Sequence, residues 1–158
     1  MFLDTVDILR GEGLSIEVGV FGEGPLGNNA DRLLAMGAEV VNRWLNETEI
    51  AAVLSRFHAV ILSHTEASQS GIAATALGAG LPAVATPVGG LIEQITDRQT
   101  GILALRADAP ALADAIIQLM RDPQLYNAIC YNIAKSREHR SMARFVEDCV
   151  SHALHAGS

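Results

Sequence analysis

Residues 59–101 read AVILSHTEASQSGIAATALGAGLPAVATPVGGLIEQITDRQTG and carry most of the information on architecture. The run Ala59–Ser63 is almost purely apolar, which is typical of a strand inside a parallel sheet. A polar loop, Glu66–Gly71, then leads to a helix of small residues that ends before Gly80, and a second apolar strand follows at Ala83–Thr86. A strand, a helix and a strand at this spacing predict a βαβ unit.

The same alternation of helical and strand-like segments extends over the chain and predicts an α/β fold. The expected strands are Ser15–Phe21, Glu39–Val41, Ala59–Ser63, Ala83–Thr86 and Ile102–Ala104. The expected helices are 2–10, 29–36, 47–57, 72–79, 91–95, 109–121, 123–136 and 142–154. We therefore expect one domain over residues 1–158, with a Rossmann-like parallel sheet of about five strands flanked by helices and a helical C-terminal third.

Several helix starts carry capping residues. Asn46 with Glu49 three positions later predicts a capping box, in which each residue bonds the backbone of the other. Asp108 and Ser141 are expected N-caps, and Ser68 or Ser70 is expected to cap the helix after residue 71. Pro110 and Pro123 fit the first turns of their helices, and these signals locate helix boundaries.

Composition and charge exclude several classes of protein. The chain has 158 residues, 49% hydrophobic and 18% charged, with a formal net charge of −7, which is typical of a globular domain. Only Lys135 is a lysine and no basic stripe is present, so we expect no nucleic-acid partner. No apolar run is long enough to cross a membrane and the N-terminus does not resemble a signal peptide, so we expect a cytoplasmic protein.

The residues that often bind metals or form disulfides show no strong pattern. Cys130 and Cys149 lie in helical segments beside apolar residues and are expected to be buried thiols. His152 and His155 are the only closely spaced histidines and are expected to be solvated. We therefore expect neither a disulfide nor a metal site.

The segment Gly22-x-Gly24-x-x-Gly27 follows an expected strand and precedes an expected helix, as in dinucleotide-binding proteins. Asn28 and Asn29 follow it, however, where apolar residues should pack the helix on the sheet. A glycine-rich turn that ends the strand is the simpler interpretation. A nicotinamide-dependent oxidoreductase domain remains an alternative.

The loop before residue 72 is a second candidate site. Gln69, Ser70 and Gly71 lead from the end of a buried strand into a helix, whose first N–H groups and dipole favour an anion. Ligands of open α/β sheets bind outside the carboxyl ends of the strands, which is where this loop is expected. The pattern indicates a phosphate-binding loop, although a capped helix without a ligand is also compatible with it.

The segment 86–93 is a third candidate. Here Thr86 ends a strand, Gly89 and Gly90 form a turn, and a short helix begins with Glu93 in its first turn. The glycines leave backbone N–H groups uncovered, so they are expected to face the same ligand as the second candidate. Glu93 on its own is equally compatible with a surface residue.

These landmarks in this order resemble the C-terminal domain of group 1, or family 4, glycosyltransferases of the GT-B fold. The resemblance rests on Glu66, Gln69-Ser70-Gly71, Gly80-x-Pro82-x-Val84-Ala85-Thr86, Val88-Gly89-Gly90, Glu93, Asp97 and Thr100-Gly101, and it extends upstream to Val18–Pro25. It implies a site for a nucleotide-diphosphate sugar, a retaining transfer and no metal or other cofactor.

The resemblance also implies roles for individual residues. The loop from Gln69 through Ser70 and Gly71 to Ile72 would hold the diphosphate, and Glu66 would lie near the sugar. Gly89 and Gly90 would face the donor, Glu93 would stand beside them, and Gly22 and Gly24 would border the cleft. Many members have a glutamate that contacts the ribose where this chain has Thr75. The catalytic base is not indicated.

The family resemblance further implies that an acceptor-binding domain and the first strand of this domain lie outside the sequence. That strand would occupy the middle of the sheet. We expect Ser15–Phe21 and Ala59–Ser63 to pair directly instead, because unpaired buried N–H groups are costly. The expected partners are a nucleotide-sugar donor and an acceptor-binding domain or protein, without which transfer is not expected. A non-catalytic interaction domain is a third alternative.

Overall fold

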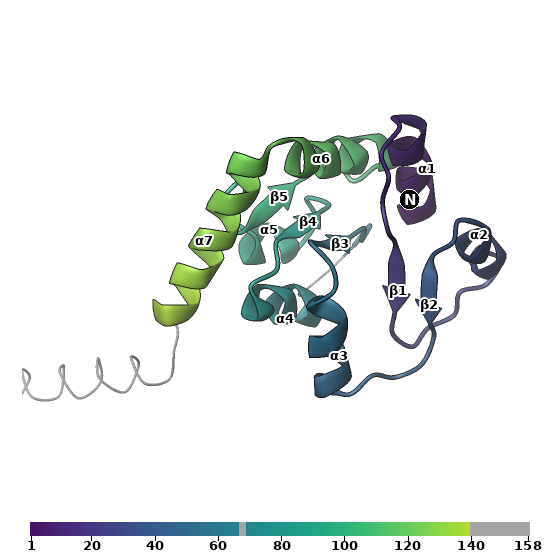
Figure 1. Ribbon diagram of the computed structural model, residues 1–158, viewed down its shortest axis with the longest axis horizontal. Helices are drawn as coiled ribbons and strands as arrows, with labels where there is room; N and C mark the ends of the chain where they lie inside the picture. Colours follow the sequence, from purple (N-terminus) through teal and green to yellow (C-terminus); the bar gives the residue numbers. More distant parts are fainter. Residues whose placement is uncertain (67–68, 140–158) are drawn as a thin grey trace, which may run out of the picture.

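The computed structural model describes residues 1–66 and 69–139 (Figure 1). Its helices are α1 (Phe2–Gly11), α2 (Asn29–Ala35), α3 (Glu47–Leu54), α4 (Gly71–Ala79), α5 (Leu91–Gln94), α6 (Ala109–Arg121) and α7 (Pro123–His139). Its strands are β1 (Gly19–Phe21), β2 (Glu39–Val41), β3 (Val60–Leu62), β4 (Ala83–Ala85) and β5 (Gly101–Leu103). The predicted α/β class is confirmed. The expected helix 142–154, its cap Ser141, and Cys149, His152 and His155 lie outside the described residues.

The strands form two parallel sheets rather than one. β1 pairs with β2, with Val20 opposite Val40. The other sheet has the order β3-β4-β5, with Ile61 opposite Val84 and Val84 opposite Ile102. The single parallel sheet of about five strands that the sequence predicted is therefore divided into two.

The expected pairing of β1 with β3 is wrong, because no ladder joins these two strands. The physical reason lies in α1, which leads into β1 and packs against α6. Leu9 of α1 is buried in the same core as Leu112 of α6, and Thr5 Oγ1 donates a 3.4 Å hydrogen bond to the carbonyl of Ala109. α1 is therefore fixed on α6, and β1, which follows it in the chain, pairs with β2 and not with β3.

The larger sheet lies between two layers of helices. In Figure 1, α6 and α7 cover one face and α4 lies on the opposite face, with α5 beside it. The residues of β4 are 0% exposed, so this strand is buried on both faces. Ile129 and Ile133 of α7 complete the core on the α6 side, and Ala73 of α4 packs on the other side. This arrangement holds the carboxyl ends of β3 and β4 rigidly beside the start of α4.

Local capping follows the expectations in the described part of the chain. Asn46 accepts from the Glu49 N–H at 2.9 Å while Glu49 accepts from the Asn46 N–H at 3.0 Å, so the capping box is confirmed. Asp108 caps α6 by accepting from the Ala111 N–H at 2.8 Å. Gly80 ends α4 in the left-handed conformation, with φ of 88°, which a residue with a Cβ adopts only with strain.

Cys130, on α7, is a free thiol of intermediate exposure, so the expectation of full burial is wrong for this residue.

Candidate functional site

The start of α4 is held in place by its own cap. Ser70 is 6% exposed, and its side chain accepts a 3.3 Å hydrogen bond from the Ala73 N–H. Ser70 is therefore the cap of α4, and the alternative Ser68 lies outside the described residues. The nine-residue helix that follows has first-turn N–H groups without acceptors inside the helix. Its amino end therefore carries partial positive charge toward the carboxyl end of β3.

Gln94 braces this helix start from α5. Its Oε1 accepts from the Ser70 N–H at 2.9 Å, and its Nε2 donates to the Ser70 carbonyl at 3.1 Å. One side-chain amide thus satisfies both backbone groups of the capping residue. The second and third candidate segments are therefore joined through this pair of bonds. Gln94 is absent from the sequence-based set of site residues, because its partner lies 24 positions earlier in the chain.

The turn before α5 presents backbone donors beside this loop. Gly89 has φ of 45° and Gly90 directly precedes α5. Among the described residues, no hydrogen bond takes up the N–H of Gly89 or Gly90. Thr86, 0% exposed, fixes the root of the turn by donating to the His64 carbonyl at 2.6 Å. This hydrogen bond joins the residues that follow β3 and β4, just before the glycine turn in the chain.

The glycines after β1 are differently placed. The Gly22 N–H donates to the Val41 carbonyl at 3.1 Å, and the Gly24 N–H donates to Asn42 Oδ1 at 3.0 Å. Both donors are thus engaged by the end of β2 and the residue that follows it. Gly22 lines the large cavity described below, but neither glycine holds a free donor, which weighs against the dinucleotide alternative, since that pattern needs open backbone near a pyrophosphate.

The remaining predicted residues lie around the same end of the larger sheet. Gln69 and Gly71 are exposed, and Ile72 is 40% exposed. Thr75 is exposed and donates to the Gly71 carbonyl at 2.9 Å. Its hydroxyl proton is therefore used within α4, whereas its oxygen can still accept a hydrogen bond.

Two carboxylates flank this group. Glu66 is exposed and lies at the last described position before the gap at 67–68, and Glu93 is exposed on α5. No ion pair joins either of them to another side chain within residues 1–66 and 69–139. Both are therefore available at the rim of the loop and glycine turn.

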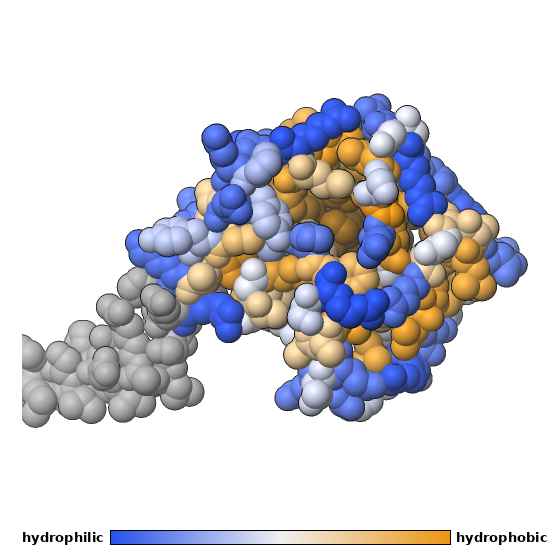
Figure 2. Space-filling view, viewed as in Figure 1, coloured by the Kyte–Doolittle hydropathy of each residue, from blue (hydrophilic) through white to orange (hydrophobic). Residues whose placement is uncertain are grey.

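A cavity of about 1180 Å³ opens beside these elements. Gly22, Glu23, His64 and Ile72 line the part near the carboxyl ends of β1 and β3, while its deeper part lies between the two strands. Figure 2 shows a hollow with a largely apolar lining on this face of the molecule. The Nδ1 atom of His64 is buried and has no hydrogen-bond partner in the described part of the chain. Of the predicted residues, this cavity brings Gly22 and Ile72 to one surface.

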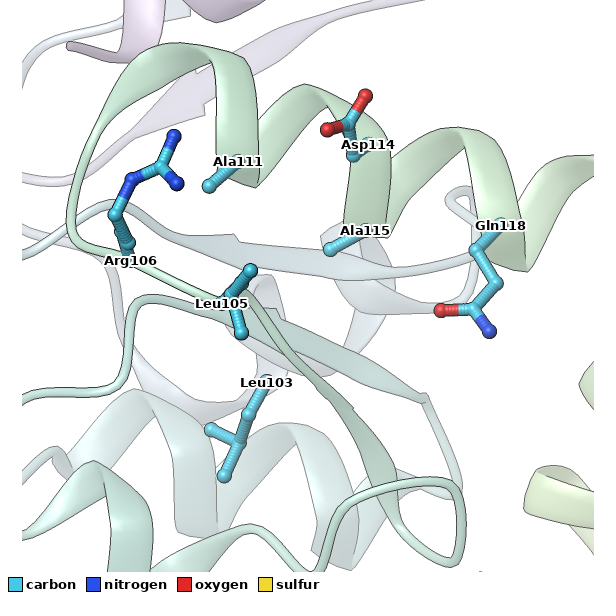
Figure 3. A pocket seen from close by; sticks show the side chains of 7 residues that line it. All are labelled: Leu103, Leu105, Arg106, Ala111, Asp114, Ala115 and Gln118. Atoms are coloured by element: carbon cyan, nitrogen blue, oxygen red, sulfur yellow. The ribbon is translucent and has the colours of Figure 1, made fainter.

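A smaller cavity of about 290 Å³ lies between the end of β5 and α6 (Figure 3). Leu103 and Leu105 form one wall and Ala111 and Ala115 the other. Arg106 at its rim bonds Asp108 at 2.7 Å, so its charge is already paired. No predicted site residue lines this cavity, and we assign it no role.

Arg43, which follows β2 in the chain, is also engaged in an ion pair. Arg43 bonds Glu49 at 2.6 Å, and this bond, with the Asn46 backbone bond, lowers the pKa of Glu49 to about 2. The described residues contain no group of three His, Cys, Asp or Glu side chains close enough to hold a metal ion. None of the described helices combines the length and apolar character needed to cross a bilayer.

The sequence of this chain is similar to a known family of proteins. The profile described as glycosyl transferases group 1 matches residues 1–122. Glycogen synthase of Mycobacterium tuberculosis is 38% identical over 80 residues, which are 50% of this chain and 19% of that protein.

Solved structures show the same fold at low identity. Sucrose-phosphate synthase from Thermosynechococcus elongatus superposes with a TM-score of 0.70 at 20% identity, over 99% of this chain and 43% of that one. HepE of Anabaena, in complex with UDP and glucose, gives 0.72 at 16%, over 96% and 44%. The C-terminal domain of LpcC, a group 1 protein from Francisella tularensis, gives 0.72 at 17%, over 88% and 76%.

The chain spans less than half of the two longer structures and aligns with about a fifth of the glycogen synthase. The profile covers more than three quarters of the chain and includes the loop, the glycine turn and the strands that support them. This chain belongs to the group 1 glycosyltransferases.

Proposed function

We propose that this chain binds the diphosphate of a nucleotide-sugar donor at the start of α4 and beside Gly89 and Gly90. The observation that carries this proposal is the double hydrogen bond between Ser70 and Gln94, which fixes the helix start against the glycine turn. Backbone N–H groups at a helix start and in a glycine turn are suited to phosphate oxygens. The UDP complex of HepE, a protein of the same fold, supports a nucleotide diphosphate as the ligand class.

The proposal includes a role in transfer. The chain supplies the donor half of a retaining, metal-independent glycosyl transfer, and an acceptor-binding domain or protein supplies the other half. Proximity of donor and acceptor accounts for much of the rate of such reactions, so the chain alone is inactive. Glu66 and Glu93 lie toward the sugar, and Thr75 takes a place near the ribose.

Titration calorimetry with UDP, ADP and GDP, and with their glucose conjugates, tests donor binding. NAD and NADP serve as comparison ligands in the same titrations. We expect at least one nucleotide diphosphate to bind and the nicotinamide dinucleotides not to bind. Binding of the dinucleotides alone would favour the oxidoreductase alternative, and no binding of any nucleotide would favour a non-catalytic domain.

A matched pair of substitutions tests the location. A Cβ added at Gly71 or at Gly78 meets no atom within 4 Å, so both positions of α4 accept a side chain. Gly71→Asp places a negative charge at the helix start, where it should repel the diphosphate and weaken binding by about tenfold or more. Gly78→Asp carries the same charge at the far end of α4 and should leave affinity nearly unchanged. Equal loss in both variants contradicts the assigned site.

A further inference from the structure

Trp44 is the only tryptophan of the chain, and its side chain is 69% exposed. A single exposed apolar side chain is common on protein surfaces and by itself indicates no site. Trp44, however, lines the large cavity that brings Gly22 and Ile72 of the candidate site to one surface, and Leu45 beside it lines the same cavity. The indole is therefore an accessible, flat apolar surface in the wall of a candidate binding site.

Hydrogen bonds hold the segment around Trp44 on both sides. Arg43 Nη1 donates to the Trp44 carbonyl at 2.9 Å and to Glu49 Oε2 at 3.2 Å, while Arg43 Nη2 donates to Glu49 Oε1 at 2.6 Å. Glu49 is itself fixed, because it belongs to the capping box of α3. On the other side, Asn42 accepts a 3.0 Å hydrogen bond from the Gly24 N–H. The position of the Trp44 backbone is therefore set before any ligand binds.

The helices beside α4 indicate which end of a bound donor reaches Trp44. α4 contacts both α3 and α5 and lies between them in Figure 1. On the α3 side, Ile50 of α3 and Ala76 of α4 share a small apolar core. Trp44 precedes α3 in the chain, whereas Glu93 belongs to α5. A donor with its diphosphate at the start of α4 and its sugar toward Glu93 therefore extends its nucleoside toward α3 and Trp44.

We propose that the indole of Trp44 stacks on the nucleobase of the donor, and that Arg43 and Glu49 position it for this contact. The inference rests on the proposed donor site. Stacking uses the π-face that every base has, so it strengthens binding without selecting one base. A sugar would need hydrogen bonds to its hydroxyl groups, whereas the chain neighbours of Trp44 are the apolar Leu45 and Arg43, whose charge is paired. Trp44 is thus a binding residue, and Arg43 and Glu49 are positioning residues.

The fluorescence of Trp44 gives a direct readout, because no other tryptophan contributes to it. The intact chain is titrated with UDP, ADP and inorganic pyrophosphate, followed by indole emission and by calorimetry. We expect each nucleotide that binds to quench the emission with the dissociation constant that calorimetry gives, and pyrophosphate to leave the emission unchanged. Nucleotide binding without quenching, or equal quenching by pyrophosphate, would overturn the inference and leave the donor site intact. No calorimetric binding of any probe would overturn the donor site and the inference together.

Substitution of Trp44 separates stacking from phosphate binding. Trp44→Ala should weaken nucleotide binding by about fivefold to a hundredfold and leave pyrophosphate affinity unchanged, whereas Trp44→Phe keeps an aromatic face and should restore most of the affinity. Tyr131→Ala is the control, because this side chain on α7 is 67% exposed but is outside the cavity lining. Wild-type nucleotide affinity in Trp44→Ala, or an equal loss for pyrophosphate, would contradict stacking.

Glu49→Gln tests the positioning role. The amide still accepts from the Asn46 N–H but lacks the charge that holds Arg43, so the Trp44 carbonyl is held less firmly. Nucleotide affinity should fall by about twofold to tenfold, with weaker quenching at saturation and unchanged pyrophosphate affinity. Glu47→Gln, in the same turn of α3, is the control. Wild-type nucleotide affinity and quenching in Glu49→Gln would overturn the positioning role of Arg43 and Glu49.

Discussion

The half built on β3, β4 and β5 and the half built on β1 and β2 differ in how completely they are buried. The former has a central strand that is 0% exposed, with helices on both faces. Both strands of the latter lack a fully buried residue, and this half rests mainly on Leu3, Leu33 and Ala38. The free donors of the candidate site lie on the well-buried half, whereas the glycine N–H groups of the other half are engaged. The proposed donor site therefore lies on the half that is more completely buried.

The largest expected effect concerns the junction of the halves. Leu9→Ala removes a side chain that is 2% exposed between α1 and α6 and should lower the free energy of unfolding by about 2–5 kcal/mol. Hydrogen exchange should speed up over β1 and β2 more than over β3–β5. Leu34→Ala on α2, where the side chain is 65% exposed, is the control and should change little. Equal acceleration in both halves would show one cooperative unit.

A matched pair of valines compares the two sheets directly. Val84→Ala in β4 removes two buried methyl groups and should cost about 2–3 kcal/mol of unfolding free energy. Val40→Ala in β2, where the side chain is half-buried, should cost about 1 kcal/mol. Urea denaturation measures both. Equal losses would mean that the smaller sheet is packed as tightly as the larger one.

The next prediction concerns the two hydrogen bonds between Gln94 and Ser70. Gln94→Ala leaves the partly buried backbone groups of Ser70 unpaired and should destabilise the protein by about 1–3 kcal/mol. It should also weaken nucleotide binding, because the start of α4 is no longer fixed. Gln94→Glu keeps the acceptor but loses the donor and adds a charge, so intermediate stability and weaker phosphate binding are expected. Calorimetry and urea denaturation separate the two effects, and unchanged affinity in both variants would remove Gln94 from the site.

The smallest effect is a pH dependence at the start of α3. Arg43 and the Asn46 N–H lower the pKa of Glu49 from 4.5 to about 2, so the charged form stabilises the fold. This stabilisation is present above pH 4.5 and is lost as the pH falls toward 2. Glu49→Gln keeps the capping contact and should lose less stability than the wild type between pH 5 and pH 2. Glu47→Gln in the same turn is the control, and a wild-type slope in Glu49→Gln would contradict the assignment.

Features set by neighbours in sequence were predictable, and those set by packing were not. The Asn46–Glu49 capping box and the cap at Asp108 depend on residues three positions apart, so the sequence indicates them directly. The separation of β1 from β3 depends on where α1 docks, and no local pattern contains that information. Gln94 escaped prediction for the same reason.

The sequence predicted the positions of some candidate site residues but not the hydrogen bonds of others. The segments around Ser70 and Gly89 do meet, because the βαβ pattern brings the carboxyl ends of neighbouring parallel strands to one edge. Gly22 and Gly24 were expected to border the cleft, but the end of β2 and Asn42 accept hydrogen bonds from their N–H groups. That competition becomes visible only when the second strand is in place.

The bond pair between Ser70 and Gln94 has a thermodynamic consequence. A loop that must be ordered by its ligand loses conformational entropy at the moment of binding, and affinity falls accordingly. Here the ordering of the capping residue is completed during folding, because an amide of the protein holds both of its backbone groups. Affinity for an anion at this helix start should therefore depend on enthalpy and salt concentration far more than on immobilising the chain.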